Sequence, residues 1–123
     1  MKSRDSALRA KRFEAAEKAR KVASLESMIR DFELMVLDLS RQIGAEEERT
    51  GIQDPAHFAY STFAKAAAQR RGNLMTSVAD LKAKLDAARR DHEDIASELQ
   101  KLEPAPDDLD RLHRKADPRA MAG

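Results

Sequence analysis

The residues that could carry acid–base or metal chemistry are the three histidines and the acidic run around one of them. His57, His92 and His113 lie in three separate regions, and none belongs to a His-Glu-x-x-His motif. The run 91–94, Asp-His-Glu-Asp, falls in a segment expected to be helical, where consecutive side chains point in different directions and cannot converge on one ion. We therefore expect no catalytic residue and no metal site.

Nucleotide and nucleophile chemistry also lack their motifs. The chain has no glycine-rich phosphate loop and no nucleophile elbow. It has no cysteine, which excludes disulfides and thiol catalysis. We expect a protein that is not an enzyme and takes no cofactor and no small-molecule substrate.

The dominant pattern is instead a pair of heptad runs, in which apolar residues recur at steps of three and four. The first run is Val22, Leu25, Ile29, Phe32, Val36, Leu39 and Ile43, and the second is Leu74, Val78, Leu81, Leu85, Ala88, His92, Ile95, Leu99 and Leu102. This rhythm keeps one stripe facing a partner helix in a left-handed coiled coil. A composition that is 37% charged and 4% aromatic favours a solvated rod over a globule. The predicted fold is all-α, with two long helices in an antiparallel coiled-coil hairpin.

Glycine and proline residues set the expected boundaries of the two helices. We expect one hairpin domain over 1–103, with a first helix over about 4–50, a loop over 51–54 and a second helix over about 55–103. Gly51 suits the left-handed position that ends a helix, and Asp54 followed by Pro55 suits the start of one. Pro104 and Pro106 end the second helix, and residues 104–123 are expected to form a flexible, mostly disordered tail.

The register should bury the largest apolar area, and a slip of one heptad would bury less. The preferred register pairs Leu8 with Leu102, Leu25 with Leu85, Ile29 with Leu81, Phe32 with Val78 and Val36 with Leu74. Extending the heptads backward places Lys11 and Lys18 at seam (d) positions. Two interpretations stay open for this end: long basic stems lying along a frayed seam, or an end held by another protein.

The N-terminal end is basic, since residues 1–21 carry eight Lys or Arg against three acids. Such an end suits an acidic protein surface, nucleic acid or anionic lipid. Nucleic-acid binding would want interleaved aromatic residues, and only Phe13 is present, so we expect none. There is no apolar run of the roughly 20 residues that span a bilayer and no secretory signal, which favours a cytosolic protein.

Apolar residues outside the seam gather on the first helix. Met28 and Met35 fall beside the seam, whereas Leu34 and Leu37 face away from it. A helix that is apolar nearly all round expects more than one neighbour. Scattered surface leucines are the plainer explanation, but clustering within about three turns favours a partner surface.

Three aromatic residues, Phe58, Tyr60 and Phe63, follow the expected loop. One interpretation is a small cap that closes the end of the coiled coil. The other is a binding surface, and an aromatic side chain can serve both purposes.

The segment DPAHFAYSTFAKAAAQRRGNL, over 54–74, is distinctive. Together with the preceding Gly51-Ile52-Gln53 and the opening MKSRDSALRAKRFEAAEKARKVASLESMI, it resembles the FliJ family of flagellar export proteins, most closely the short alphaproteobacterial form. The resemblance covers about residues 1–103.

That resemblance implies a soluble stalk or chaperone-like component of the flagellar type III protein export apparatus. It would be cytoplasmic and peripheral to the export apparatus of the inner membrane, with the export ATPase, the membrane export gate protein and export chaperones as partners. We expect Arg4, Arg9, Lys11 and Arg12 to contact the ATPase. The residues expected to serve the gate or the chaperones are Leu34, Leu37, Phe58, Tyr60 and Phe63.

Two other classes of function compete with this one. A generic coiled-coil adaptor or chaperone would bind through the apolar residues without an ATPase contact. Binding to nucleic acid or an anionic membrane through the basic end is the weaker alternative, and it would fall steeply with salt.

Overall fold

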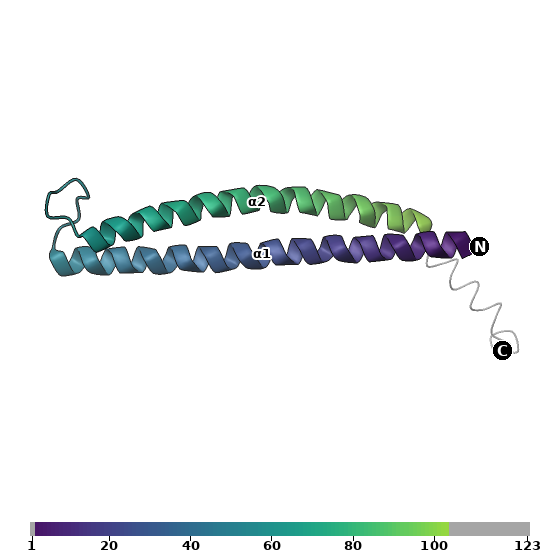
Figure 1. Cartoon of the computed structure of the whole chain (residues 1–123), viewed down its shortest axis with the longest axis horizontal. Coiled ribbons are helices and arrows are strands. Elements are labelled where there is room, and N and C mark those ends of the chain that lie inside the picture. The colour runs from purple at the N-terminus through teal and green to yellow at the C-terminus, as the bar shows by residue number, and fades with distance from the viewer. Residues whose placement is uncertain (1, 104–123) are drawn as a thin grey trace, which may run out of the picture. The chain divides into compact units, whose positions relative to one another are not determined.

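Two long helices make up nearly all of the described chain. The computed structural model describes residues 2–103. Helix α1 spans Lys2–Thr50 and helix α2 spans Thr62–Leu102, and no strand occurs between residues 2 and 103 (Figure 1). The helices pack against each other as an antiparallel hairpin, which confirms the predicted all-α fold. The predicted tail, 104–123, lies outside the described residues.

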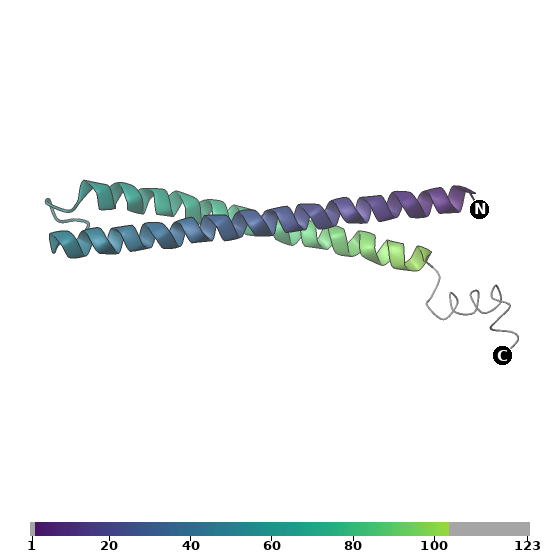
Figure 2. The ribbon, with the colours of Figure 1, turned by 90° about the horizontal axis from the view of Figure 1, so that it is seen from below.

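The chain divides into two compact units, and each contains a segment of both helices. Unit 1 comprises 1–19 and 90–123, of which 2–19 and 90–103 are described, and unit 2 comprises 20–89. Unit 2 therefore includes the loop between the helices. Figures 1 and 2 show that the two helix segments of unit 2 lie side by side in both views.

The core of unit 2 falls into two clusters, in which predicted heptad residues are joined by Ala64 and Ala67, which precede the predicted second run. The first cluster contains Leu25, Ile29, Val78, Leu81, Leu85 and Ala88, with Val22 and Phe32 packed against it. The second contains Leu39, Ile43, Ala64 and Ala67, with Tyr60, Ala68 and Leu74 packed against it. Alanine supplies half of the second cluster, so the helices can approach closely where they meet the loop.

Ion pairs on one flank of unit 2 report the register. Glu26 pairs with Arg89 and Glu33 pairs with Lys82, each with 3.7 Å between the nitrogen and the carboxylate oxygen. One heptad forward on α1 thus matches one heptad backward on α2. These are the e–e′ partners of the predicted register, whereas the slipped register would have placed Glu26 beside Lys82.

Unit 1 has a much thinner core. Among its described residues only Ile95 is buried, at 9% exposure. Leu8 is half-buried and Leu102 is 36% exposed, so the predicted Leu8–Leu102 layer contributes little apolar burial. Charged contacts between the helices take over in this unit, as described below.

The loop is longer than predicted, and helix α2 does not begin at Pro55. Gly51 has a φ of 74° and its N–H donates to the carbonyl of Glu47 at 2.9 Å, which ends α1 as expected. Asp54 then accepts the Ala56 N–H on its side chain at 2.9 Å, but this closes a single turn that does not continue. The prediction of a helix over about 55–103 is wrong at its start, because an Asx turn and a helix cap use the same residue types.

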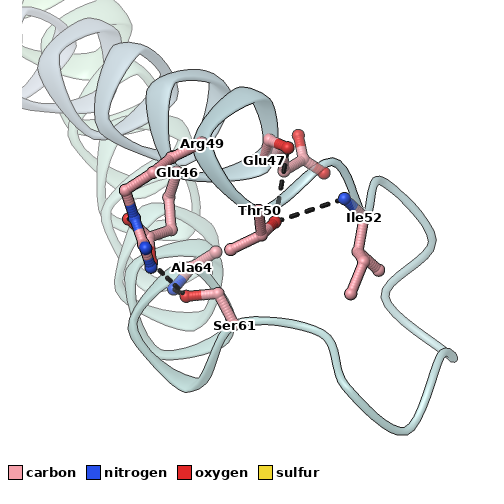
Figure 3. A network of polar contacts seen from close by, with 7 residues as sticks. All are labelled: Glu46, Glu47, Arg49, Thr50, Ile52, Ser61 and Ala64. Atoms are coloured by element: carbon pink, nitrogen blue, oxygen red, sulfur yellow. Dashed lines mark hydrogen bonds and ion pairs between the residues drawn. The ribbon is translucent and has the colours of Figure 1, made fainter.

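The true start of α2 is capped by Ser61. The hydroxyl of Ser61 accepts the Ala64 N–H at 3.2 Å and donates to Glu46 on α1 at 2.9 Å. Glu46 also binds Arg49, and the hydroxyl of Thr50 accepts the N–H of Ile52 at 3.2 Å (Figure 3). The beginning of α2 is therefore fastened to the end of α1 by side chains.

Replacing Ser61 by alanine should lower the free energy of unfolding by about 1 kcal/mol, because the substitution removes an N-cap. Urea unfolding followed by circular dichroism measures this. The matched control is Asp54→Ala, which removes the turn at the position where the helix was first predicted to start. A larger loss for Asp54→Ala than for Ser61→Ala would contradict the observed helix start.

Candidate partner-binding surfaces

The four basic residues expected to meet an ATPase divide into two kinds. Arg4 and Arg9 are exposed and form no ion pair within residues 2–103. Lys11 and Arg12 reach across to α2, where Lys11 binds Glu98 and Arg12 binds Glu103 at 3.0 Å. Of these four residues, only Arg4 and Arg9 can therefore bind a partner without breaking an ion pair in the described part of unit 1.

The two lysines at seam positions are both paired with acids of α2. The Lys11 Nζ lies 2.7 Å from Glu98 and the Lys18 Nζ lies 4.0 Å from Asp91. Their side chains are 34% and 33% exposed, so the aliphatic stems lie along the seam while the ammonium groups stay at the surface. This is the first of the two interpretations left open for this end, and contact with another protein stays a prediction.

The ion pair between Lys11 and Glu98 shifts the pKa of both groups. The hydrogen bond to Glu98 raises the pKa of Lys11, and the nearby Glu14, at 3.7 Å, raises it further. The same hydrogen bond from Lys11 lowers the pKa of Glu98 below its ordinary value of 4.5. Both shifts favour the charged forms, which are the forms that pair α1 with α2 in unit 1.

Unit 2 carries an apolar groove between its helices on the same flank as the e–e′ ion pairs. Its floor and walls are Val36, Leu37, Met75, Val78 and Ala79, with Glu33, Ser40 and Lys82 at its edges, and its volume is about 430 Å³. A second hollow, of about 360 Å³, is lined by Arg30, Glu33, Leu34 and Leu37. Since both hollows share Leu37, the exposed Leu34 and Leu37, at 64% and 50%, belong to one continuous apolar surface.

The groove opens where the ladder of e–e′ ion pairs stops. After Glu33–Lys82, the next pair of e positions holds Ser40 and Met75, which cannot form an ion pair. Ser40 instead accepts a hydrogen bond from Arg71 at 3.2 Å. Met75 is left 55% exposed beside Leu37. The uncharged pair of e positions, Ser40 and Met75, thus leaves exposed the apolar side chains that an ion pair would otherwise screen.

The three aromatic residues near the loop separate into three places. Tyr60 packs against the second cluster, and its hydroxyl donates to Glu47 at 3.1 Å, so it closes the core as the cap interpretation predicted. Phe63, 56% exposed, borders a shallow hollow of about 190 Å³ that Leu39 and Arg70 also line. Phe58 stands on the loop and is 96% exposed. The three do not form one surface.

Sequence reasoning missed the α2 side of the groove. Met75 and Ala79 are not predicted as binding residues, because on α2 alone they are two isolated apolar residues and become part of a surface only beside α1. The signal was present in the heptad itself: Met75 is an apolar residue at an e position, and it faces Leu37 only once the antiparallel register is applied.

The described residues offer neither a metal centre nor a membrane span. No cluster of three or more His, Asp or Glu within 2–103 is arranged to hold a metal ion. Neither α1 nor α2 contains a stretch long and apolar enough to cross a bilayer.

Comparison of the chain with protein-family models, with curated proteins and with solved structures found no match. The geometry of the two surfaces is therefore the basis on which a function can be argued.

Unit 1 should respond to pH through the Lys11–Glu98 pair. Because the pKa of Glu98 is lowered, its stabilising effect is present above 4.5 and is lost as pH falls through the folded-state pKa. Because the pKa of Lys11 is raised, its effect is present below 10.5 and is lost as pH rises through its folded-state value. On acidification, amide-exchange protection in 8–18 and 91–99 should fall before protection in the apolar core of unit 2, and it should fall again as pH rises through the folded-state pKa of Lys11.

Glu98→Gln provides the control for this measurement. It should lower protection in unit 1 at neutral pH and flatten the acid response, leaving unit 2 unchanged. High salt should mimic it, since exposed charges are screened. Simultaneous loss of protection in both units on acidification would contradict the assignment to this pair.

Tyr60 is the only tyrosine, so its ionisation can be followed by ultraviolet absorbance without interference from another phenol. Desolvation raises its pKa above 10.0, and the hydrogen bond to Glu47 raises it further. We expect a phenolate midpoint above 10.0, and Glu47→Gln should move it back toward that value. A midpoint at 10.0 in the unmodified chain would show that Tyr60 is not packed on the core. Unit 2 should lose stability as pH rises through this midpoint, since the neutral phenol is the form that packs.

Proposed function

We propose that this chain is a stalk and chaperone-like component of the bacterial flagellar type III protein export apparatus. In this role it links the export ATPase ring to the membrane export gate and aids delivery of substrates and their chaperones. It works in the cytoplasm at the inner-membrane export apparatus. The observation that carries the proposal is the contrast between a charge-held unit 1 and an apolar unit 2.

Unit 1 suits a grip by another protein. Its two helix segments bury one described residue, Ile95, and are joined by ion pairs that an acidic surface could replace. Arg4 and Arg9 are exposed without ion pairs inside the described chain. A ring with acidic inner surfaces could hold a basic, loosely packed helix pair. Lys11 and Arg12 would then exchange Glu98 and Glu103 for acidic residues of the ring.

Unit 2 suits recognition of apolar segments. Its core fixes the two helices in one register, so the groove beside Leu37 and Met75 keeps its shape without a partner. Leu34 adds exposed apolar area next to Leu37, and Phe63 is a further exposed apolar side chain of unit 2, beside a separate hollow. A groove between two helices commonly accepts a third, amphipathic helix, which is a form that gate proteins and chaperones can present.

Addition of the purified chain should raise the hydrolysis rate of the export ATPase. Replacing Arg4 and Arg9 together by glutamate should abolish the increase, because both side chains are exposed and their loss leaves the ion pairs of unit 1 intact. The measurement is steady-state phosphate release as a function of chain concentration. No increase with the unmodified chain would contradict the proposal.

The matched control moves the same charges in unit 2. Arg41 and Lys65 are exposed helix residues outside both proposed surfaces, and Arg41→Glu with Lys65→Glu should keep the increase in hydrolysis. Equal loss in both double variants would indicate a general effect of net charge rather than a contact at unit 1.

The groove of unit 2 also favours a second candidate, a coiled-coil adaptor or chaperone without an ATPase contact. Such a protein would bind export chaperones through Leu34 and Leu37 and would not change ATP hydrolysis. Binding of a purified export chaperone that is lost in Leu34→Asp with Leu37→Asp, combined with an ATPase rate that the chain does not change, would identify this function instead.

A further inference from the structure

Phe13 is the largest exposed apolar side chain among the described residues of unit 1, at 66% exposure. It occupies an f position of α1, on the side of the helix opposite the seam, so α2 does not cover it. Arg9 and Ala16 lie one turn before it and one turn after it, and both are exposed. This face of α1 therefore presents an aromatic ring beside a guanidinium group.

Positive charge at this end of α1 is only partly neutralised within the described chain. Residues 2–13 contain five Lys or Arg and a single acid, Asp5. Lys11 and Arg12 have acidic partners, whereas Arg9 is exposed and forms no ion pair among residues 2–103. Such an excess of cations attracts a segment that is rich in carboxylates.

The described chain ends beside this face. The Oε1 of Glu103 lies 3.0 Å from the Nε of Arg12, and the Glu103 N–H donates to the carbonyl of Leu99 at 3.0 Å. Arg12 directly precedes Phe13 and follows Arg9 by three residues, or about 4.5 Å of helix rise. The residues after Glu103 therefore start from a point close to both Phe13 and Arg9.

The sequence after Glu103 is complementary to this face. Residues 107–112 read Asp-Asp-Leu-Asp-Arg-Leu, which supplies three carboxylates and two leucines. An extended chain spans up to about 3.3–3.6 Å per residue, so Leu109, six residues past Glu103, has a reach of roughly 20 Å. This reach equals roughly three to four turns of helix and includes both Arg9 and Phe13.

A segment of the same chain is favoured over a separate partner by its short tether. Three residues, 104–106, join it to the end of the described chain. A short linker holds a segment near its site at an effective concentration in the millimolar range. Exposed ion pairs are individually weak, so this tethering decides which carboxylates occupy the face. A segment with too few apolar residues for a core of its own can still become ordered on such a surface.

We propose that residues 107–112 fold back on α1 of unit 1, with Leu109 and Leu112 against the ring of Phe13 and the neighbouring aspartates beside Arg9. The contact lies within one chain and is independent of the proposed function. Its consequence is regulatory, because a partner with an acidic surface can bind Arg9 only after it displaces the carboxylates of this segment.

Nuclear magnetic resonance of the full chain tests the contact directly. Leu109 and Leu112 should show nuclear Overhauser cross-peaks to the Phe13 ring, whose ring current should also shift their methyl signals upfield. Phe13→Ala should remove the cross-peaks and return both methyl signals to random-coil values, without a change in thermal unfolding, since the ring is exposed. Phe63→Ala removes an exposed ring from unit 2 instead and should leave these signals unchanged.

The carboxylates are tested by a triple change to asparagine at Asp107, Asp108 and Asp110. This variant should weaken the cross-peaks severalfold, and high salt should act in the same direction, since exposed charges are screened. The matched control makes the same change in net charge with three exposed aspartates of unit 2 and should keep the cross-peaks intact. Its substitutions to asparagine are at Asp31, Asp80 and Asp86.

Random-coil methyl signals for Leu109 and Leu112 in the unmodified chain would overturn the proposal. Cross-peaks between labelled and unlabelled chains in a mixed sample would also overturn it, because the contact would then join two molecules. Equal weakening in both triple variants would refute the pairing with Arg9. None of these results depends on the export ATPase, so the proposed function is tested separately.

Discussion

Burial of one apolar stripe against another is the interaction on which the rest of this molecule depends. Each fully buried Leu or Ile in such a seam stabilises by roughly 1.5–3 kcal/mol relative to an exposed one. Because the chain offers few aromatic residues, no other apolar core is available to unit 2. Once the seam fixes the register, the e–e′ ion pairs, the position of the groove and the distance that the loop must bridge all follow from it.

The two units use different physics for the same helix pairing. In unit 2 the seam is apolar and ion pairs such as Glu33–Lys82 flank it. In unit 1 the ion pairs themselves occupy seam positions, through Lys11 and Lys18. Exposed ion pairs contribute little stability and are screened by salt. The apolar seam of unit 2 therefore fixes the structure, whereas the helices of unit 1 can separate at a small cost in free energy.

Heptad periodicity made the helices and their register predictable, and the short segment between the two runs made the antiparallel direction predictable, because consecutive helices joined by a short loop must run back along each other. The end of α1 was also predictable, since Gly51 has few other uses at such a position. The start of α2 was not, because Asp54-Pro55 and Ser61 are both credible caps. Which of them continues into a helix depends on Glu46, fifteen residues from Ser61 in sequence.

The candidate surfaces were predictable only in part, for a related reason. Exposure of Leu34, Leu37 and Phe58 followed from their positions outside the seam. The separation of Tyr60 from Phe58 did not, since it depends on the path of the loop. Met75 was invisible as a binding residue until α2 was placed beside α1, because a groove belongs to two helices and to neither sequence segment alone.

The spacing of charges in unit 1 has a consequence for motion. Lys11 and Lys18 are one heptad apart on α1, and Asp91 and Glu98 are one heptad apart on α2. A slide of one heptad would therefore exchange Asp91 for Glu98 beside Lys18, leaving Lys11 with Glu14 on its own helix. Of the three interhelical ion pairs of unit 1, only that of Lys18 would keep an acidic partner on the described part of α2, and the buried Ile95 would need a new apolar neighbour. Because α1 and α2 each run unbroken through both units, the same slide would displace the leucines and isoleucines of the first cluster in unit 2, so that cluster also sets the register of the charged pairs in unit 1.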